Sequence, residues 1–145
     1  METAFSILVV EDDELVRSFL ARALSGVSEH VDACGSGAEA LEAVDGTRYA
    51  AILLDGLLPD IHGVERGRRL IHLPQAAGAG ICFVSGSLRR AAPMRSGISA
   101  LPKPLRLREL TDAVTELLAW HTRHDASIAD RVAALDTLAA ELLVG

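Results

Sequence analysis

A few charged and hydroxyl side chains follow directly after apolar runs, and their types suit the transfer of a phosphoryl group to an aspartate. Glu11 and Asp12 follow the first such run, Asp55 the third, Ser85 the fourth and Lys103 the fifth. Three carboxylates brought together without a cation repel one another, so the set predicts a hard divalent ion. Mg²⁺ fits best, because it prefers oxygen ligands and retains some of its waters. The hydroxyl and the ammonium can stabilise charged phosphoryl oxygens.

Lys103 is the only lysine of this chain, in which Lys and Arg together number 14. It lies in an apolar run flanked by Pro102 and Pro104. A lysine is a compact charge on a thin stem and reaches a single oxygen in a narrow site, whereas arginine presents a broad planar fork. The alternative is an ordinary solvated surface lysine. The rest of the sequence distinguishes a functional lysine from a solvated one.

The elements that must bring these side chains together are short apolar runs that alternate with helical patterns. This alternation is typical of βαβ units, and it predicts the α/β class with a parallel sheet. The carboxyl ends of parallel strands meet at one edge of the sheet, where such folds place their sites. We expect strands at 5–10, 30–34, 49–54, 81–84 and 98–101, and helices at 15–24, 38–44, 64–73, 107–121 and 128–142, with 87–95 as the weakest helical candidate because it is short and contains Pro93.

Asp55, Pro59 and Gly63 form the pattern Asp-x-x-x-Pro-x-x-x-Gly. With Val9-Val10-Glu11-Asp12 before it, and Ser85 and Lys103-Pro104 after it, the chain resembles the receiver domain of bacterial response regulators over residues 5 to about 120. The resemblance implies a flavodoxin-like, doubly wound sheet of five parallel strands in the order 2-1-3-4-5. It also implies that a histidine kinase or a histidine phosphotransfer protein donates the phosphoryl group.

The resemblance also implies residue roles. Asp55 is the expected phosphoacceptor, and Ser85 and Lys103 are expected to contact the phosphoryl group. The expected Mg²⁺ ligands are Glu11, Asp12, Asp55 and the backbone carbonyl of Leu57, whereas Asp13 and Glu14 suit the start of a helix through its dipole. The Lys103–Pro104 bond is expected to be cis, as is usual in the family.

Two departures from the family affect its signalling surface. Receivers usually carry an aromatic residue three positions before the lysine, and here that residue is Ala100. The interval from Ser85 to Lys103 is also about one helical turn shorter than is common. We therefore predict that the phosphorylation chemistry is kept while the output is rerouted through the C-terminal helix. Leu57 and Ser87 flank the route of the hydrolytic water, and the apolar Leu57 predicts a long-lived phosphoryl group.

We divide the chain into a receiver domain at residues 1–122 and a C-terminal helical extension at 123–145. In the extension Ile128, Val132, Leu135, Ala139 and Leu142 repeat with heptad-like spacing. This helix either packs back on the domain or pairs with another subunit in a homodimer. The extension is too short for a DNA-binding module, which predicts a stand-alone regulator with output by protein contact or phosphate relay.

Three other functions compete with a working receiver. A phosphatase of the haloacid dehalogenase type needs a second aspartate two residues after the first, where this chain has Leu57; we expect no enzymatic turnover beyond the domain's own phosphorylation and dephosphorylation. A flavodoxin-like cofactor binder needs a phosphate-binding loop after the first strand, and the acids from Glu11 would repel a phosphate. A degenerate receiver that serves only as an interaction module is favoured by Ala100 and opposed by the intact Asp55 and Lys103.

The composition argues against two further classes of function, nucleic-acid binding and membrane insertion. A net charge of −6 without a large basic cluster does not support nucleic-acid binding. No run approaches the roughly 20 apolar residues of a membrane span, so we expect a cytoplasmic protein without membrane contact.

Cys34 and Cys82 are expected to be buried free thiols. His62 is expected to be a solvated loop histidine, and His121 and His124 lack a third ligand for a metal.

Overall fold

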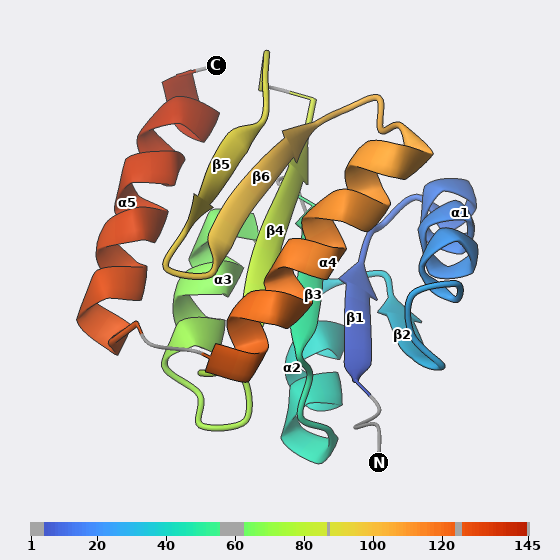
Figure 1. Cartoon of the computed structure of the whole chain (residues 1–145), viewed down its shortest axis with the longest axis horizontal. Coiled ribbons are helices and arrows are strands. Elements are labelled where there is room, and N and C mark those ends of the chain that lie inside the picture. Colours follow the sequence, from blue (N-terminus) through green and yellow to red (C-terminus); the bar gives the residue numbers. More distant parts are fainter. Residues whose placement is uncertain (1–4, 56–62, 87, 124–125, 145) are drawn as a thin grey trace.

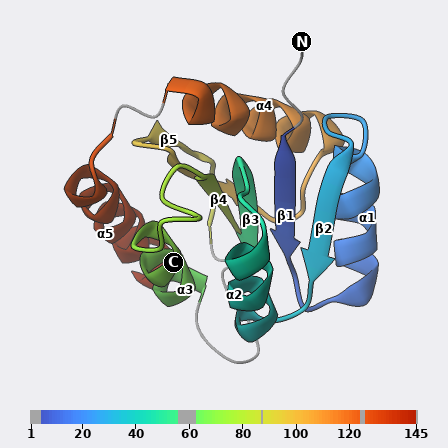
Figure 2. The ribbon, with the colours of Figure 1, turned by 90° about the horizontal axis from the view of Figure 1, so that it is seen from below.

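The computed structural model of this chain describes residues 5–55, 63–86, 88–123 and 126–144. Its single sheet has the strand order β2-β1-β3-β4-β6-β5, with helices on both faces (Figures 1 and 2). The strands are β1 (Ser6–Val10), β2 (His30–Cys34), β3 (Ala51–Asp55), β4 (Gly80–Ser85), β5 (Ala92–Arg95) and β6 (Ile98–Pro102). The helices are α1 (Glu14–Leu24), α2 (Gly37–Gly46), α3 (Gly63–Ile71), α4 (Leu107–Arg123) and α5 (Ile128–Val144).

The five predicted strands are all present and parallel, in the predicted order. The central strands β3 and β4 are buried at every position. Strands covered on both faces are expected to be continuously apolar, as these two nearly are. Alternate strand residues enter two cores: one lies under α1 and α4, and the other under α2, α3 and α5 (Figure 2). The flavodoxin-like fold class is confirmed.

Helix starts follow the capping residues of the sequence. The backbone N–H of Val16 donates to Asp13 at 3.0 Å, which caps α1, and Ser36 caps α2 by accepting from the backbone of Glu39. Ser127 and Asp130 exchange side-chain-to-backbone hydrogen bonds at the start of α5. Cys34 and Cys82 are buried free cysteines, as predicted.

The helix predicted at 87–95 is wrong, because residues 92–95 form the edge strand β5 and pair antiparallel with β6. Pro93 opposes a helix interior but is tolerated in an edge strand. Ser96 and Gly97, both at positive φ, turn the chain back into β6. An added Cβ on Gly97 would lie 2.7 Å from the Trp120 ring, so glycine is needed for the close approach as well as for the turn.

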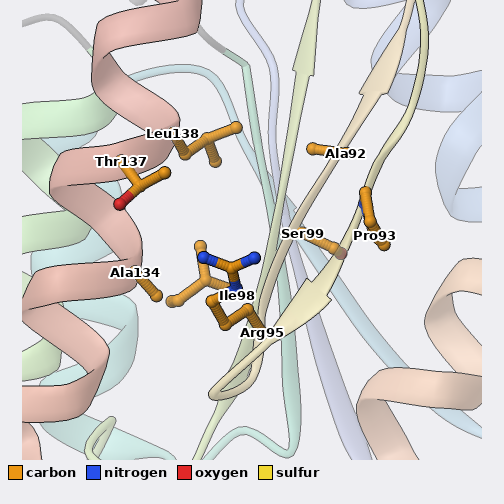
Figure 3. A pocket seen from close by; sticks show the side chains of 8 residues that line it. All are labelled: Ala92, Pro93, Arg95, Ile98, Ser99, Ala134, Thr137 and Leu138. Atoms are coloured by element: carbon orange, nitrogen blue, oxygen red, sulfur yellow. The ribbon is translucent and has the colours of Figure 1, made fainter.

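The C-terminal helix α5 packs back on the domain, beside α3 and over β5 and β6 (Figure 1). Its buried stripe is Arg131, Ala134, Leu135, Leu138 and Ala139. Leu135 and Ala139 of the predicted seam are therefore buried, but Ile128 is 47 % exposed. A cavity of about 80 Å³ remains between this stripe and the β5–β6 hairpin (Figure 3). Pairing of two subunits through this helix stays a prediction.

Candidate functional site

The register of the sheet places the candidate side chains along one edge. Val10 lies opposite Leu54, so the next residues, Glu11 and Asp55, leave their strands together. Asp55 lies opposite Val84 on β4. The backbone N–H of Glu11 donates to the Cys34 carbonyl at 3.0 Å, which continues the β1–β2 ladder by one step.

Ser85 and Lys103 complete this edge on the other side of Asp55. Ser85 ends β4 opposite Pro102 and is buried. The backbone N–H of Lys103 donates to the Ser85 carbonyl at 3.0 Å, which fixes the start of the lysine stem beside β4. The following Lys103–Pro104 peptide bond is cis, as the family resemblance implied.

Three carboxylates gather at this edge. Glu11, Asp12 and Asp55 each offer an oxygen, and these oxygens lie within 4.8 Å of one another. Glu11 is 1 % exposed and Asp55 7 %, whereas Asp12 is exposed. No other group of three potential metal-ligating side chains occurs among the described residues. The site is therefore an acidic pocket with one solvent-facing wall.

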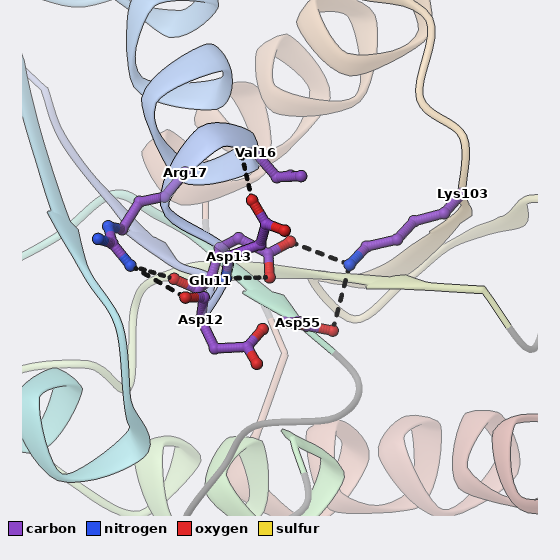
Figure 4. Close-up of polar contacts among 7 residues, drawn as sticks. All are labelled: Glu11, Asp12, Asp13, Val16, Arg17, Asp55 and Lys103. Atoms are coloured by element: carbon purple, nitrogen blue, oxygen red, sulfur yellow. Dashed lines mark hydrogen bonds and ion pairs between the residues drawn. The ribbon is translucent and has the colours of Figure 1, made fainter.

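Lys103 bridges two of these acids. Its Nζ lies 2.9 Å from Oε1 of Glu11 and 3.5 Å from Oδ1 of Asp55 (Figure 4). The lysine side chain extends from the end of β6 across the pocket, and about a third of it is exposed. The ammonium is thus held between two buried acids.

The electrostatics of the pocket follow from burial and crowding. Burial, together with the neighbouring Asp55 carboxylate, raises the pKa of Glu11 to about 7 even though Lys103 opposes the shift. A hydrogen bond with Glu11, and a weaker one with Asp55, lower the pKa of Asp12. Desolvation lowers the pKa of Lys103, but its contacts with Glu11 and Asp55 outweigh this and leave it raised. The pocket has an excess of negative charge that one ammonium does not neutralise.

The donor set fits Mg²⁺. All three side chains offer hard carboxylate oxygens, Asp12 is exposed to solvent, and a cation would offset the burial and the neighbouring Asp55 carboxylate that raise the pKa of Glu11. Leu57, Pro59, His62 and Ser87 lie outside the described residues, so the predictions for them stay predictions.

Sequence reasoning missed Arg17. Its Nη1 donates to the backbone carbonyls of Glu11 at 2.9 Å and Asp12 at 3.4 Å (Figure 4). A cation near a helix N-terminus opposes the helix dipole. That unfavourable placement is the signal in the sequence that could have identified Arg17 as a residue with a separate role.

Apolar side chains beside the pocket were also missed as a surface. Leu15 is 82 % exposed and Phe19 48 % exposed on α1. With Pro104 and Leu105 they line an open groove that reaches Lys103. Exposed apolar surfaces of this kind are typical of interaction sites.

His121 does not join a metal group in the described residues. Its Nδ1 lies 2.7 Å from the Gly78 carbonyl, and its ring packs edge-on against Phe5. His124 lies outside the described residues. None of the described helices is long and apolar enough to cross a bilayer.

Comparison with known proteins gives a consistent result. The family model described as the response regulator receiver domain matches residues 7–115. The response regulator MprA of Mycobacterium ulcerans is 35 % identical over 133 residues, which cover 88 % of this chain and 56 % of MprA. The receiver protein CpdR of Brucella abortus is 29 % identical over 116 residues, which cover 77 % of this chain and 95 % of CpdR. The chain thus spans about half the length of MprA and most of CpdR.

Solved structures agree on the fold. The chemotaxis response regulator CheY4 of Vibrio cholerae superposes with a TM-score of 0.66 at 20 % identity, covering 80 % of this chain and all of CheY4. The receiver domain of the sensor histidine kinase PA1611 of Pseudomonas aeruginosa gives a TM-score of 0.69 at 22 % identity, covering 81 % of this chain and 99 % of that domain. That structure holds a magnesium ion in its active-site cleft.

Proposed function

Because the chain belongs to the response regulator receiver domain family, we propose that it accepts a phosphoryl group on Asp55 from a histidine kinase or a histidine phosphotransfer protein. The observation that carries this proposal is the arrangement of Lys103, which reaches the carboxylates of Glu11 and Asp55 from the end of β6, on the far side of β4. An acceptor carboxylate, an acidic cation site and a single ammonium are what phosphoryl transfer to an aspartate requires.

In the proposed reaction, a carboxylate oxygen of Asp55 attacks the phosphorus of a phosphohistidine. The new P–O bond forms as the P–N bond breaks, and the electron pair of that bond stays on the donor imidazole, which takes up a proton. Lys103 loosens its contact with Asp55 and pairs with the phosphoryl oxygens, where its point charge offsets the developing negative charge. The Ser85 hydroxyl at the end of β4 donates to another of these oxygens.

Mg²⁺ would be held by Glu11, Asp12, Asp55 and the Leu57 carbonyl, and would neutralise charge on the phosphoryl oxygens. Glu11 contributes only once it has lost its proton. The backbone of Glu11 and Asp12 is held in place by Arg17, so the two acids keep their spacing without a cation. We propose that the domain assists its own phosphorylation and dephosphorylation and turns over no separate substrate.

The groove along α1 supports a helical phosphodonor as the partner. Leu15 and Phe19 are four residues apart and so lie on one face of α1, and this face runs beside Lys103 and Leu105. A donor helix laid along the groove would bring its phosphohistidine to the open wall of the acidic pocket. The exposed apolar area supplies the binding energy, and Asp55 supplies the acceptor.

The decisive experiment is incubation with phosphoramidate and Mg²⁺, followed by intact mass. We expect a mass gain of one phosphoryl group in the native protein and none in Asp55→Asn. Asp13→Asn serves as the matched control, because Asp13 caps α1 and lies outside the acidic cluster, and it should be phosphorylated like the native chain. A native protein that gains no phosphoryl group from any donor would instead support a degenerate receiver that acts as an interaction module.

A further inference from the structure

Two segments that leave the candidate site contribute to the core that the C-terminal helix α5 completes. One is α3, which begins at Gly63 after the acceptor loop and packs beside α5. The other is the connection after Ser85, in which Leu88 is buried in the same core cluster as Ala134 and Leu138 of α5. The helix therefore packs against one of the two segments that leave Asp55 and Ser85, and shares its core with the other.

The first turn of α5 is anchored far from the site. Arg131 is 1 % exposed, and its guanidinium donates to the carbonyls of Ser96, Ala77 and Ala79. It also lies 4.5 Å from the centroid of the Trp120 ring. Ser96 lies in the hairpin turn and Ala77 and Ala79 precede β4, so this anchor is at the opposite end of the sheet from Asp55 (Figure 1).

The later turns of α5 are held more loosely. Asp136 pairs with Arg68 of α3, but both side chains are partly exposed, and such pairs contribute little. Beneath Leu138 and Thr137 the packing leaves the cavity of about 80 Å³ against the hairpin (Figure 3). The helix thus combines a firm first turn with a weakly held remainder that extends toward the acceptor edge.

Ala100 explains how α5 can occupy this face. Receivers usually carry an aromatic side chain at this position, whereas here a methyl group is fully buried in the core that α5 completes. A ring at residue 100 would need the volume that the helix and its neighbours fill.

From these contacts we infer that α5 is the output element of the domain: phosphorylation of Asp55 loosens its later turns while Arg131 holds the first. This inference rests on the proposed function. With Lys103 paired to Glu11 and Asp55, Leu135 and Leu138 of the helix are buried. A shift of Ser85 toward a phosphoryl oxygen would move the connection that carries Leu88 and would cost packing in the core that Leu88 shares with α5, because cores are close-packed and tolerate little displacement.

Hydrogen exchange of α5, measured with and without phosphoramidate and Mg²⁺, tests this inference directly. In a sample that intact mass shows to be phosphorylated, we expect exchange in the later turns of α5 to speed up on the order of tenfold, within the range of allosteric couplings. Exchange in α2 serves as the internal reference and should not change. A phosphorylated sample with unchanged α5 exchange overturns the inference alone; a sample without any mass gain overturns the proposed function and the inference with it.

A second test works in the opposite direction, because a domain whose α5 is already loosened has less packing to lose on phosphorylation. Leu138→Ala weakens the docking of α5 and should raise the extent of phosphorylation at limiting phosphoramidate several-fold. Leu24→Ala removes the same side chain from the core on the other face of the sheet and should leave that extent unchanged. Equal phosphorylation of the two variants, with both folded by circular dichroism, would refute the coupling.

Discussion

Lys103 lies closer to Glu11 than to Asp55, with its Nζ at 2.9 Å and 3.5 Å from the respective carboxylate oxygens. The Lys103 ammonium therefore pairs more closely with Glu11, a candidate metal ligand, than with Asp55, the candidate phosphoacceptor. Cation binding at Glu11 and the release of Lys103 toward the acceptor are consequently linked.

Lys103→Met separates the effect of the ammonium on cation binding from its effect on phosphorylation. Without the ammonium the acidic pocket becomes more negative, so we expect Mg²⁺ to bind several-fold more tightly. The rate of phosphorylation should nevertheless fall, on the order of a hundredfold, because one stabilising donor is lost. Titration with Mg²⁺ and intact-mass kinetics measure the two quantities, with Lys103→Arg as the charge-conserving control. A variant that loses Mg²⁺ binding along with phosphorylation would contradict this linkage.

The raised pKa of Glu11 predicts a pH-dependent cost of folding. A carboxyl group whose folded pKa is about 7, against 4.5 in the unfolded chain, holds its proton more tightly when folded. Its contribution to stability is therefore present at low pH and is lost as pH rises from about 4.5 through about 7.

Glu11→Gln removes that cost. In buffer with EDTA, we expect the unfolding free energy of the variant relative to the native protein to rise by about 1 to 3 kcal/mol between pH 5 and pH 8. Urea denaturation at several pH values measures this difference. Added Mg²⁺ should stabilise the native protein more than the variant, and a difference that does not vary with pH would refute the explanation.

Arg131→Met tests the anchor of α5. The variant leaves the carbonyls of Ser96, Ala77 and Ala79 without their donor, and unpaired buried acceptors are costly. We expect a loss of about 2 to 4 kcal/mol in unfolding free energy, with a shift in the emission of Trp120, the only tryptophan. The exposed Arg123→Met should change stability by less than about 0.5 kcal/mol. Equal stabilities of the two variants would remove the anchoring role.

Both thiols should resist modification in the folded protein. Burial raises the pKa of Cys34 to about 11 and that of Cys82 to about 12, so neither forms much thiolate at pH 8. Iodoacetamide should therefore alkylate both only after unfolding in urea, as followed by mass. Fast alkylation of Cys34 in the native state would show that the end of β2 opens.

The positions of the candidate site residues followed from the sequence, because each stands directly after an apolar strand and parallel strands end at one edge. The β5 strand did not follow from the sequence. Residues 92–95 contain few β-formers and pair only because β6 lies beside them. Such pairing depends on the neighbouring strand, so the β-propensity of the segment alone does not predict it. The inner face of α5 was partly missed because Arg131 reads as a polar position, although its partners are three distant backbone carbonyls.

The β5–β6 hairpin has a consequence for how the chain folds. In a βαβ unit, the helix that covers a pair of parallel strands lies between them in the chain, so strand pairing and coverage form together. Here β4, β5 and β6 are complete by residue 102, whereas the helix over β5 and β6 begins only at Ile128. During synthesis, this apolar sheet face therefore emerges well before its cover, and its closure is a late, long-range step.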